Sequence, residues 1–332
     1  MEKIIYKNGI IDLAQPRLGS KVIYKTDDFF ASAQRILNPS IPVFKEGLFD
    51  KNGKWMDGWE SRRKRIKGYD YLIIKLGRPG KIKKIDVDTS HFNGNQPSMF
   101  SIDAAFSKSN NFKKFNWKTL LPKKKAKANS HHEFNIKSKS TISHIRLNIF
   151  PDGGVARLRV FGSIDKEKIK FKNKKINLAS LNDGATIIAC NNEHFGKAEN
   201  ILATGKAKNM GDGWETRRRR NKGYDWLILN SITGSQISDI EISTHHFKGN
   251  FPSHCSLQAA YIPKIKSIRS IIKKSVKWKF LLNKVKLNAN KTHKFKNKLM
   301  KKNKINLIKL NIFPDGGISR IKIFGRADKW TK

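Results

Sequence analysis

The sequence predicts an all-β protein built from two tandem copies of one jelly-roll β-sandwich domain. Long segments recur at an almost constant distance along the chain, which indicates an internal repeat. Within each copy, short stretches of alternating apolar and polar residues are separated by turn-forming residues. Helical patterns are scarce, since only residues 29–37 and 193–202 suggest short helices. Many short strands with turns between them favour an antiparallel sandwich or jelly roll.

The repeat covers nearly the whole chain, and three pairs of segments define it. They are DGWESRRKRIKGYDYLII from Asp57 with DGWETRRRRNKGYDWLIL from Asp212, TSHFNGNQPS from Thr89 with THHFKGNFPS from Thr244, and LNIFPDGGVARLRVFG from Leu147 with LNIFPDGGISRIKIFG from Leu310. The first two pairs are offset by 155 residues and the third by 163, so the second copy has gained eight residues. We expect these in loops around the basic stretch 262–277. A polar, lysine-rich join near residue 166 predicts domains at 1–166 and 167–332.

Strands can be assigned within each copy from the period of the apolar residues. Residues 145–150 and 156–161 alternate with a period of two, and the PDGG sequence between them supplies turn residues. Residues 84–89 show the same alternation, and the more continuous apolar run 71–76 predicts a more buried strand. The second copy repeats the pattern, for example at Ile308, Leu310 and Ile312.

The charge of the chain is strongly positive, with 69 Lys and Arg against 26 Asp and Glu. Such an excess attracts polyanions, so a basic nucleic-acid-associated protein is one alternative. The lysines are spread along the whole chain together with many Asn and Ile, a composition typical of A/T-rich coding sequences. We find no helix-turn-helix, zinc-finger or aromatic RNA-binding pattern. We therefore expect no nucleic-acid partner.

The composition also bears on location and redox chemistry. The chain has no run of eighteen apolar residues and no long apolar stretch at its start, so we expect a cytoplasmic protein without a membrane span. Two cysteines, Cys190 and Cys255, cannot build a disulfide framework. A homo-oligomer is compatible with the sequence.

The first motif that can carry chemistry is a carboxylate followed closely by paired arginines. It occurs at Glu60, Arg62 and Arg63 and again at Glu215, Arg217 and Arg218. The planar guanidinium fork binds a carboxylate ligand through two parallel hydrogen bonds, so one interpretation is an anion clamp. The other is an internal Glu–Arg salt bridge beside a solvated basic loop.

The second motif is a turn that carries a histidine and an asparagine, His91 with Asn95 and His246 with Asn250. A histidine at this place could act as a general base or hold a metal, or it could bond a neighbouring carbonyl. The asparagine amides could bind a ligand or cap the turn.

The third motif surrounds the PDGG turn. It holds Asn148, Asp152 and Arg157 in the first copy and Asn311, Asp315 and Arg320 in the second. Arg159 becomes Lys322 whereas Arg157 remains an arginine, which indicates that the Arg157 position is the more constrained. Turn formation explains much of the role of Asp152.

Taken together, DGWETRR followed by GYDW, THHFKGN and LNIFPDGG resemble the allantoicase family, over essentially the whole chain and in both copies. The resemblance implies a pair of jelly-roll domains of the galactose-binding-like type. It also implies a hydrolase of non-peptide carbon–nitrogen bonds in linear amidines, which converts allantoate and water to ureidoglycolate and urea. That reaction follows opening of the allantoin ring in purine degradation and releases nitrogen for use.

The substrate implied by the resemblance suggests roles for the motifs, because allantoate carries one carboxylate and two ureido arms on one carbon. The hypothesis assigns the carboxylate clamp to Arg62, Arg63, Arg217 and Arg218, and the ureido arms to Asn95 and Asn250. Proton transfer falls to Glu60 or Glu215 together with His91 or His246. Further substrate-binding candidates are Asn148, Arg157, Asn311 and Arg320.

Several alternatives stay open at this stage. The site could occur twice, lie between the repeats, or be live in one repeat and vestigial in the other. No spacing requires a cofactor, although the histidines and carboxylates could hold a divalent metal such as manganese. A non-catalytic β-sandwich ligand-binding module is the main alternative function, since fold alone does not give function.

Overall fold

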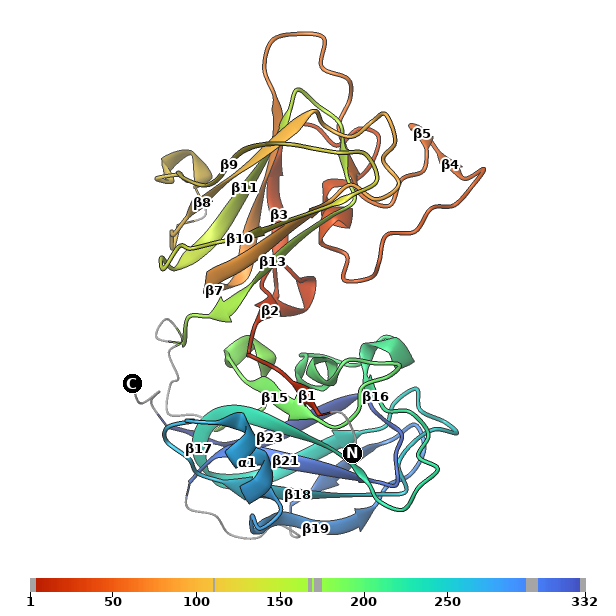
Figure 1. Cartoon of the computed structure of the whole chain (residues 1–332), viewed down its shortest axis with the longest axis vertical. Helices are drawn as coiled ribbons and strands as arrows, with labels where there is room; N and C mark the ends of the chain where they lie inside the picture. The colour runs from red at the N-terminus through yellow and green to blue at the C-terminus, as the bar shows by residue number, and fades with distance from the viewer. Residues whose placement is uncertain (1–3, 110, 167–168, 170–174, 297–303, 329–332) are drawn as a thin grey trace. The chain divides into compact units, whose positions relative to one another are not determined.

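The computed structural model describes residues 4–109, 111–166, 169, 175–296 and 304–328 (Figure 1). The chain divides into two compact units, and each is described here by itself. The first unit spans residues 10–165, and the second comprises the described residues of 1–9 and of 166–332. The segment before residue 10 belongs to the second unit because β1 (Ile5–Tyr6) pairs with β15 (Thr186–Cys190).

The first unit is built around one long strand. The eight strands of its main sheet are β2 (Ile11–Asp12), β3 (Lys21–Lys25), β7 (Asp70–Asp88), β8 (Met99–Ala105), β9 (Lys118–Lys125), β10 (His131–Asn135), β11 (Ile142–Phe150) and β13 (Arg157–Ile164). The two strands expected at 71–76 and 84–89 are the two halves of the 19-residue β7. Its first half pairs with β3 and β11 and its second half with β10 and β13, so β7 connects both layers of a sandwich.

The second unit repeats this plan. Its strands are β14 (Lys175–Asn177), β15, β17 (Asp225–Ser243), β18 (His254–Ala260), β19 (Phe280–Lys286), β20 (Thr292–Phe295), β21 (Ile305–Phe313) and β23 (Arg320–Ala327), with β1 at the edge. Strand β17 takes the place of β7, pairing with β15 and β21 through its first half and with β20 and β23 through its second. The predicted fold class, two repeated all-β jelly-roll sandwiches, is therefore confirmed.

Helical segments depart from expectation in two ways. The basic stretch 262–277, expected to form loops, contains helix α1 (Ile268–Ser275), capped by the Ser267 hydroxyl. Its apolar face forms because isoleucines three and four positions apart share one side of a helix, and Ile271 packs against the sheet. The short helices expected at 29–37 and 193–202 are 3₁₀ turns, η2 (Ala33–Leu37) and η6 (Ala198–Leu202).

A buried aromatic pair fixes one end of each sandwich. In the first unit Trp59 and Phe92 are fully buried, and the indole N–H of Trp59 donates to the Asp27 carbonyl at 2.8 Å. Burial of such side chains contributes about 1.5–3 kcal/mol each. Gly154 lies so close to Phe92 that a Cβ there would be 1.9 Å from the ring, so this position requires glycine. Trp214 has the same place in the second unit.

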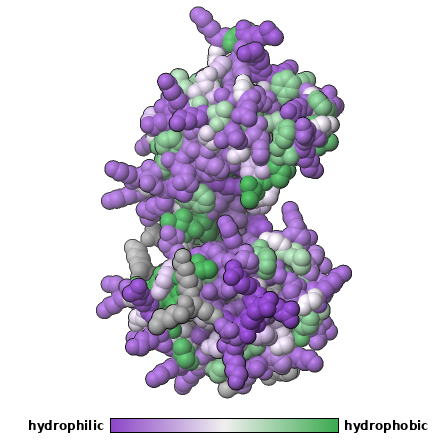
Figure 2. All heavy atoms as spheres, turned by 45° about the vertical axis from the view of Figure 1, so that its right-hand side comes forward, coloured by the Kyte–Doolittle hydropathy of each residue, from purple (hydrophilic) through white to green (hydrophobic). Residues whose placement is uncertain are grey.

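The surface is largely polar. The face shown in Figure 2 is covered mainly by hydrophilic side chains with small hydrophobic areas between them, which agrees with the dispersed lysines of the sequence. Within the described part of the chain, no helix has the length and apolar character needed to cross a lipid bilayer.

Candidate functional site

The three sequence motifs meet at one end of each sandwich. The two-residue strands β6 (Trp59–Glu60) and β12 (Gly154–Val155) pair with each other, and the Gly154 N–H donates to the Asn95 carbonyl at 2.7 Å. In the second unit β16 (Trp214–Glu215) and β22 (Gly317–Ile318) form the same pair. The glycines of PDGG therefore let the turn approach both of the other motifs.

One predicted pairing of site residues is present in both repeats. The Asn95 amide donates to the Glu60 carboxylate at 2.8 Å, and the Asn250 amide donates to the Glu215 carboxylate. Burial raises the pKa of Glu60, and the hydrogen bond from Asn95 opposes this effect only in part. A carboxyl group whose pKa is raised can hold a proton nearer to neutral pH, as a general acid requires.

The arginines of the first motif form no salt bridge with Glu60 or Glu215 among the described residues, whereas their interpretation as an anion clamp stays a prediction. The Arg62 guanidinium pairs with Asp27, with Nε 2.7 Å from the carboxylate, and lies over the ring of Phe29. The salt bridge of Arg62 is thus made with Asp27 and not with Glu60. The other three arginines of the motif are exposed: Arg63, Arg217 and Arg218.

The predicted histidines point toward the main chain. His91 has a positive φ of 68°, its N–H donates to the side chain of Asn129, and its Nε2 lies 3.2 Å from the Pro42 carbonyl oxygen. His246 has the same conformation, with Nε2 2.9 Å from the Ala207 carbonyl oxygen. Both rings thus hold a loop by a hydrogen bond to a carbonyl, which was one of the two interpretations of the sequence.

The predicted arginine after the PDGG turn lies inside each unit. Arg157 is 1% exposed and donates to the Asp57 carboxylate at 2.6 Å and to the Ser40 carbonyl at 3.0 Å. Arg320 makes the same pair with Asp212 at 2.8 Å. These arginines connect the DGWE turn to the loop before it.

The predicted asparagines Asn148 and Asn311 are buried in the middle of β11 and β21. The Asn148 amide donates to Ser101 and to Asp103, and the Asn311 amide donates to Ser256 and Gln258. Their side-chain carbonyl oxygens have no hydrogen-bond partner among the described residues.

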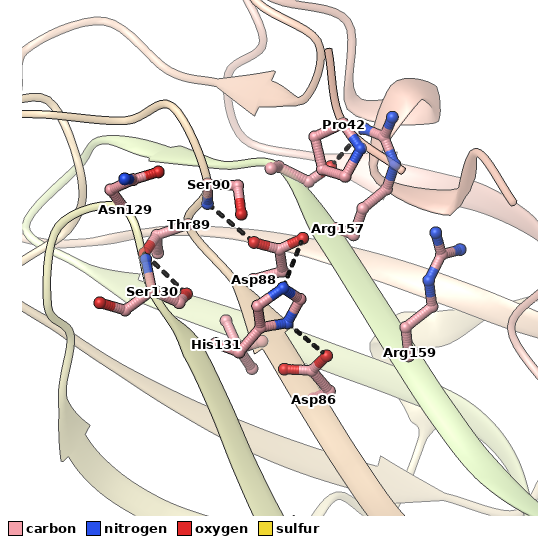
Figure 3. A network of polar contacts seen from close by, with 12 residues as sticks. Pro42, Asp86, Asp88, Thr89, Ser90, Asn129, Ser130, His131, Arg157 and Arg159 are labelled. Atoms are coloured by element: carbon pink, nitrogen blue, oxygen red, sulfur yellow. Dashed lines mark hydrogen bonds and ion pairs between the residues drawn. The ribbon is translucent and has the colours of Figure 1, made fainter. Parts of the chain in front are cut away.

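A polar network that the sequence reasoning did not single out lies on the strands of the first repeat (Figure 3). Asp86 and Asp88 of β7 face His131 of β10 on one side and Arg157 and Arg159 of β13 on the other. His131 Nδ1 lies 2.8 Å from the Asp86 carboxylate and its Nε2 lies 3.8 Å from that of Asp88. We call these five residues the first-repeat network.

The carboxylates of this network are buried, whereas its histidine is accessible to solvent. Asp86 is 6% exposed and Asp88 2%, whereas the His131 side chain is 59% exposed. The hydrogen bond to Asp86 raises the pKa of His131, burial partly opposes this rise, and the charge of Asp88 adds to it. Arg159 lies 3.6 Å from Asp12. Oδ1 of Asp86 has no hydrogen-bond partner among the described residues, so an acceptor is left unused in the network.

The sequence contained a signal for this network. Asp86 and Asp88 alternate with Ile85 and Val87, so both carboxylates lie on the same face of the strand. By itself, such a pair indicates only the polar side of an amphipathic strand. Its partners come from β10 and β13, whose pairing with β7 no local pattern reveals.

The corresponding positions of the second repeat carry different chemistry. The strand register places Glu241 and Ser243 of β17 where the first repeat has Asp86 and Asp88, and Thr292 where it has His131. Among the described residues, no group of three or more His, Cys, Asp or Glu side chains is arranged to hold a metal ion.

The chain is similar to known proteins over nearly its whole length. A family model described as the allantoicase repeat matches residues 11–165 and 176–328. A "Probable allantoicase 1" of Burkholderia mallei is 44% identical over 323 residues, covering 96% of this chain and 95% of the relative. A "Probable allantoicase" of Stutzerimonas stutzeri is 45% identical over 321 residues, covering 96% and 97%. The crystal structure of allantoicase from Saccharomyces cerevisiae superposes with a TM-score of 0.78 at 30% identity, covering 96% of this chain and 94% of that one.

Proposed function

Because the chain belongs to the allantoicase family, we propose that it hydrolyses allantoate to ureidoglycolate and urea, with the first-repeat network as the reaction centre. The family match supports the reaction. The choice of the first-repeat network as the reaction centre rests on the position of His131. Its exposed imidazole is hydrogen-bonded to the buried carboxylate of Asp86 and lies beside Asp88.

The network offers a complementary group for the carboxylate of the substrate and another for the ureido arm that leaves. Arg159 can pair with the carboxylate of allantoate, since a guanidinium suits a carboxylate geometrically. The accessible His131 then faces the ureido arm that leaves as urea.

The bond changes follow from this arrangement. The oxygen of a water molecule forms a bond to the central carbon while the bond from that carbon to one ureido nitrogen breaks. Protonated His131 donates its proton to the departing nitrogen, and the neutral imidazole then takes up the proton lost by the water. Asp86 and Asp88 stabilise the imidazolium form, so His131 begins each cycle as the acid.

The Glu60–Asn95 and Glu215–Asn250 pairs are retained in our proposal as a second set of proton-transfer and ureido-binding groups. The raised pKa of Glu60 supports this role in the first repeat. Catalysis at Glu60 and catalysis at the first-repeat network predict opposite effects of two substitutions on urea release. If the reaction takes place at Glu60, Glu60→Gln abolishes urea release while His131→Gln leaves it intact.

The decisive experiment compares urea release from allantoate by the wild-type protein and by His131→Gln. Removing a general acid lowers kcat by about 100-fold to 10,000-fold. His254→Gln, which changes a histidine of β18, is the matched control and keeps the wild-type kcat. Since the His131 side chain is 59% exposed, the variant should fold normally, which a thermal melt checks. An unchanged kcat in His131→Gln would remove the network from the mechanism.

The role of a divalent metal is tested in the same assay. We propose manganese as the metal to add after dialysis against a chelator. Rate lost on chelation and restored by manganese would assign a metal, and an unchanged rate would dismiss it. We further propose that the protein acts in the cytoplasm without a nucleic-acid partner. Salt-sensitive retention on DNA at physiological ionic strength would contradict the absence of such a partner.

A further inference from the structure

A cavity of about 390 Å³ opens in the second repeat at the place that corresponds to the first-repeat network. Pockets that bind small molecules have volumes of about 300–1,000 Å³, so this one is large enough for a small ligand. The side chains that matter for its chemistry are Lys206, Glu241, Ser243, His245, Lys294 and Lys322. We call this the second-repeat pocket.

The strand register shows how the pocket departs from the first repeat. Glu241 faces Lys294 on β20 and Lys322 on β23, whereas its counterpart Asp86 faces Glu133 and Arg159. The second buried carboxylate of the first repeat, Asp88, is replaced by Ser243, and Ser90 is replaced by His245. When Glu133 is counted with the first-repeat network, two acidic positions and one histidine are lost and a lysine is gained, so the pocket carries more net positive charge.

The internal contacts of the pocket leave cationic charge uncompensated. Glu241 pairs with both Lys322 at 3.1 Å and Lys294 at 3.4 Å, so one carboxylate serves two ammonium groups. Lys206 at the rim is exposed and adds a third positive charge. A pocket with this balance attracts an anion.

The pocket also contains groups that recognise neutral polar atoms. The ring nitrogens of His245 have no hydrogen-bond partner among the described residues, and its main-chain N–H donates to Ser243. The Glu241 carboxylate can accept from N–H groups of a ligand. A ligand that satisfies the whole pocket therefore carries a negative charge together with amide-like donors and acceptors.

We propose that the second-repeat pocket binds a small ureido carboxylate, the chemical class of allantoate and ureidoglycolate, without hydrolysing it. The choice of this class rests on the proposed function. The ligand carboxylate lies among the lysines, its ureido N–H groups face Glu241, and His245 bonds the ureido oxygen. The pocket lacks the carboxylate-bound histidine on which we base catalysis in the first repeat, so it binds and does not react.

The test is calorimetric titration of the full chain with N-carbamoylglycine, a carboxylate with one ureido arm. All proteins carry His131→Gln and Arg159→Gln, so neither turnover nor carboxylate binding by the first-repeat network contributes to the measurement. We expect Lys294→Glu to weaken binding by about tenfold or more, which equals about 1.4 kcal/mol. The Lys294 side chain is 66% exposed, so the change should not impair folding. The matched control Lys277→Glu alters an exposed lysine outside the pocket and should leave the affinity unchanged.

Four results would overturn the proposal. Equal weakening by Lys277→Glu would mean that only the net charge of the protein matters. Equal affinity for inorganic phosphate would show a general anion site without ureido recognition, and equal affinity for the uncharged amide of N-carbamoylglycine would refute the role of the lysines. Binding that survives Lys294→Glu would place the ligand elsewhere. If the pocket binds the ligand in this test but the wild-type protein releases no urea from allantoate, only the proposed function is contradicted.

Discussion

The hydrogen bond between His131 and Asp86 has a measurable consequence for the pKa of the imidazole. Asp86→Asn replaces the carboxylate whose hydrogen bond contributes most to the rise in the pKa of His131. Because the His131 side chain is 59% exposed, solvent screens the pair, and we take the upper end of the range for surface pairs, about 1 kcal/mol. Without this pair, the pKa of His131 should fall toward the ordinary value of a histidine.

The sign of the effect on activity follows from the role of His131 as an acid. The raised pKa keeps the imidazole protonated to higher pH, and kcat falls as pH rises through it. Other charged groups that act on His131 are Asp88 on β7 and Glu133 on β10, and Arg159 on β13 faces Asp86 from the other side of β7. With Asp86→Asn the decline of kcat should begin at a lower pH than in the wild-type protein. The same pKa shift stabilises the folded state below the ordinary histidine pKa, and this stability is lost as pH rises through the folded value.

The assay is an NMR titration of the His131 ring in the wild-type and variant proteins, together with the pH profile of kcat. Glu133→Gln is the matched control, because Glu133 is exposed and its charge is the weakest of the influences on His131. We expect a smaller shift there. An unchanged His131 pKa in Asp86→Asn, or an unchanged pH profile despite a shifted pKa, would refute the reasoning.

Three further predictions concern the scaffold. Arg157→Met leaves a buried carboxylate unpaired and should lower the free energy of unfolding by about 3–5 kcal/mol, against about 1 kcal/mol or less for exposed Arg62→Met, both measured by urea denaturation. Gly317→Ala places a Cβ 2.1 Å from the aromatic ring that it faces and should cost about 1–3 kcal/mol, whereas Gly249→Ala meets nothing within 4 Å and should cost far less. Burial lowers the pKa of Lys309 in the folded protein. The charged lysine therefore destabilises the folded state at pH values below this folded pKa, and the destabilisation disappears as pH rises from the folded pKa to the unfolded pKa. Lys309→Met should therefore stabilise the protein at neutral pH, with the gain shrinking as pH rises in thermal melts.

The fold could be predicted from the sequence because its signals are local and occur twice. The alternation at 145–150 and the PDGG turn recur almost unchanged at 308–313 and 314–317, which identifies both the strands and the repeat. The joining of two predicted strands into β7 was missed because glycines and a proline interrupt the apolar pattern at 77–80 without ending the strand. Helix α1 was missed because eight residues in a lysine-rich stretch give only a weak period.

The candidate site could be predicted only where its residues share a repeated motif. Glu60 and Asn95 stand in two motifs that recur together, and the structure pairs them. The ion pair of Arg62 could not be predicted in this way, because its partner Asp27 lies outside every repeated segment. His131 was missed because its position in the second repeat holds threonine, so comparison of the repeats gave no reason to select it.

The most direct test of the central claim is a product analysis with purified protein and allantoate at neutral pH. We expect one urea and one ureidoglycolate for each allantoate consumed by the wild-type protein. The double variant Asp86→Asn with His131→Gln, folded by its thermal melt, should form neither product above the uncatalysed rate. Wild-type kcat in the double variant would remove the reaction from the first-repeat network. No urea from the folded wild-type protein, with or without added manganese, would contradict the proposed activity itself.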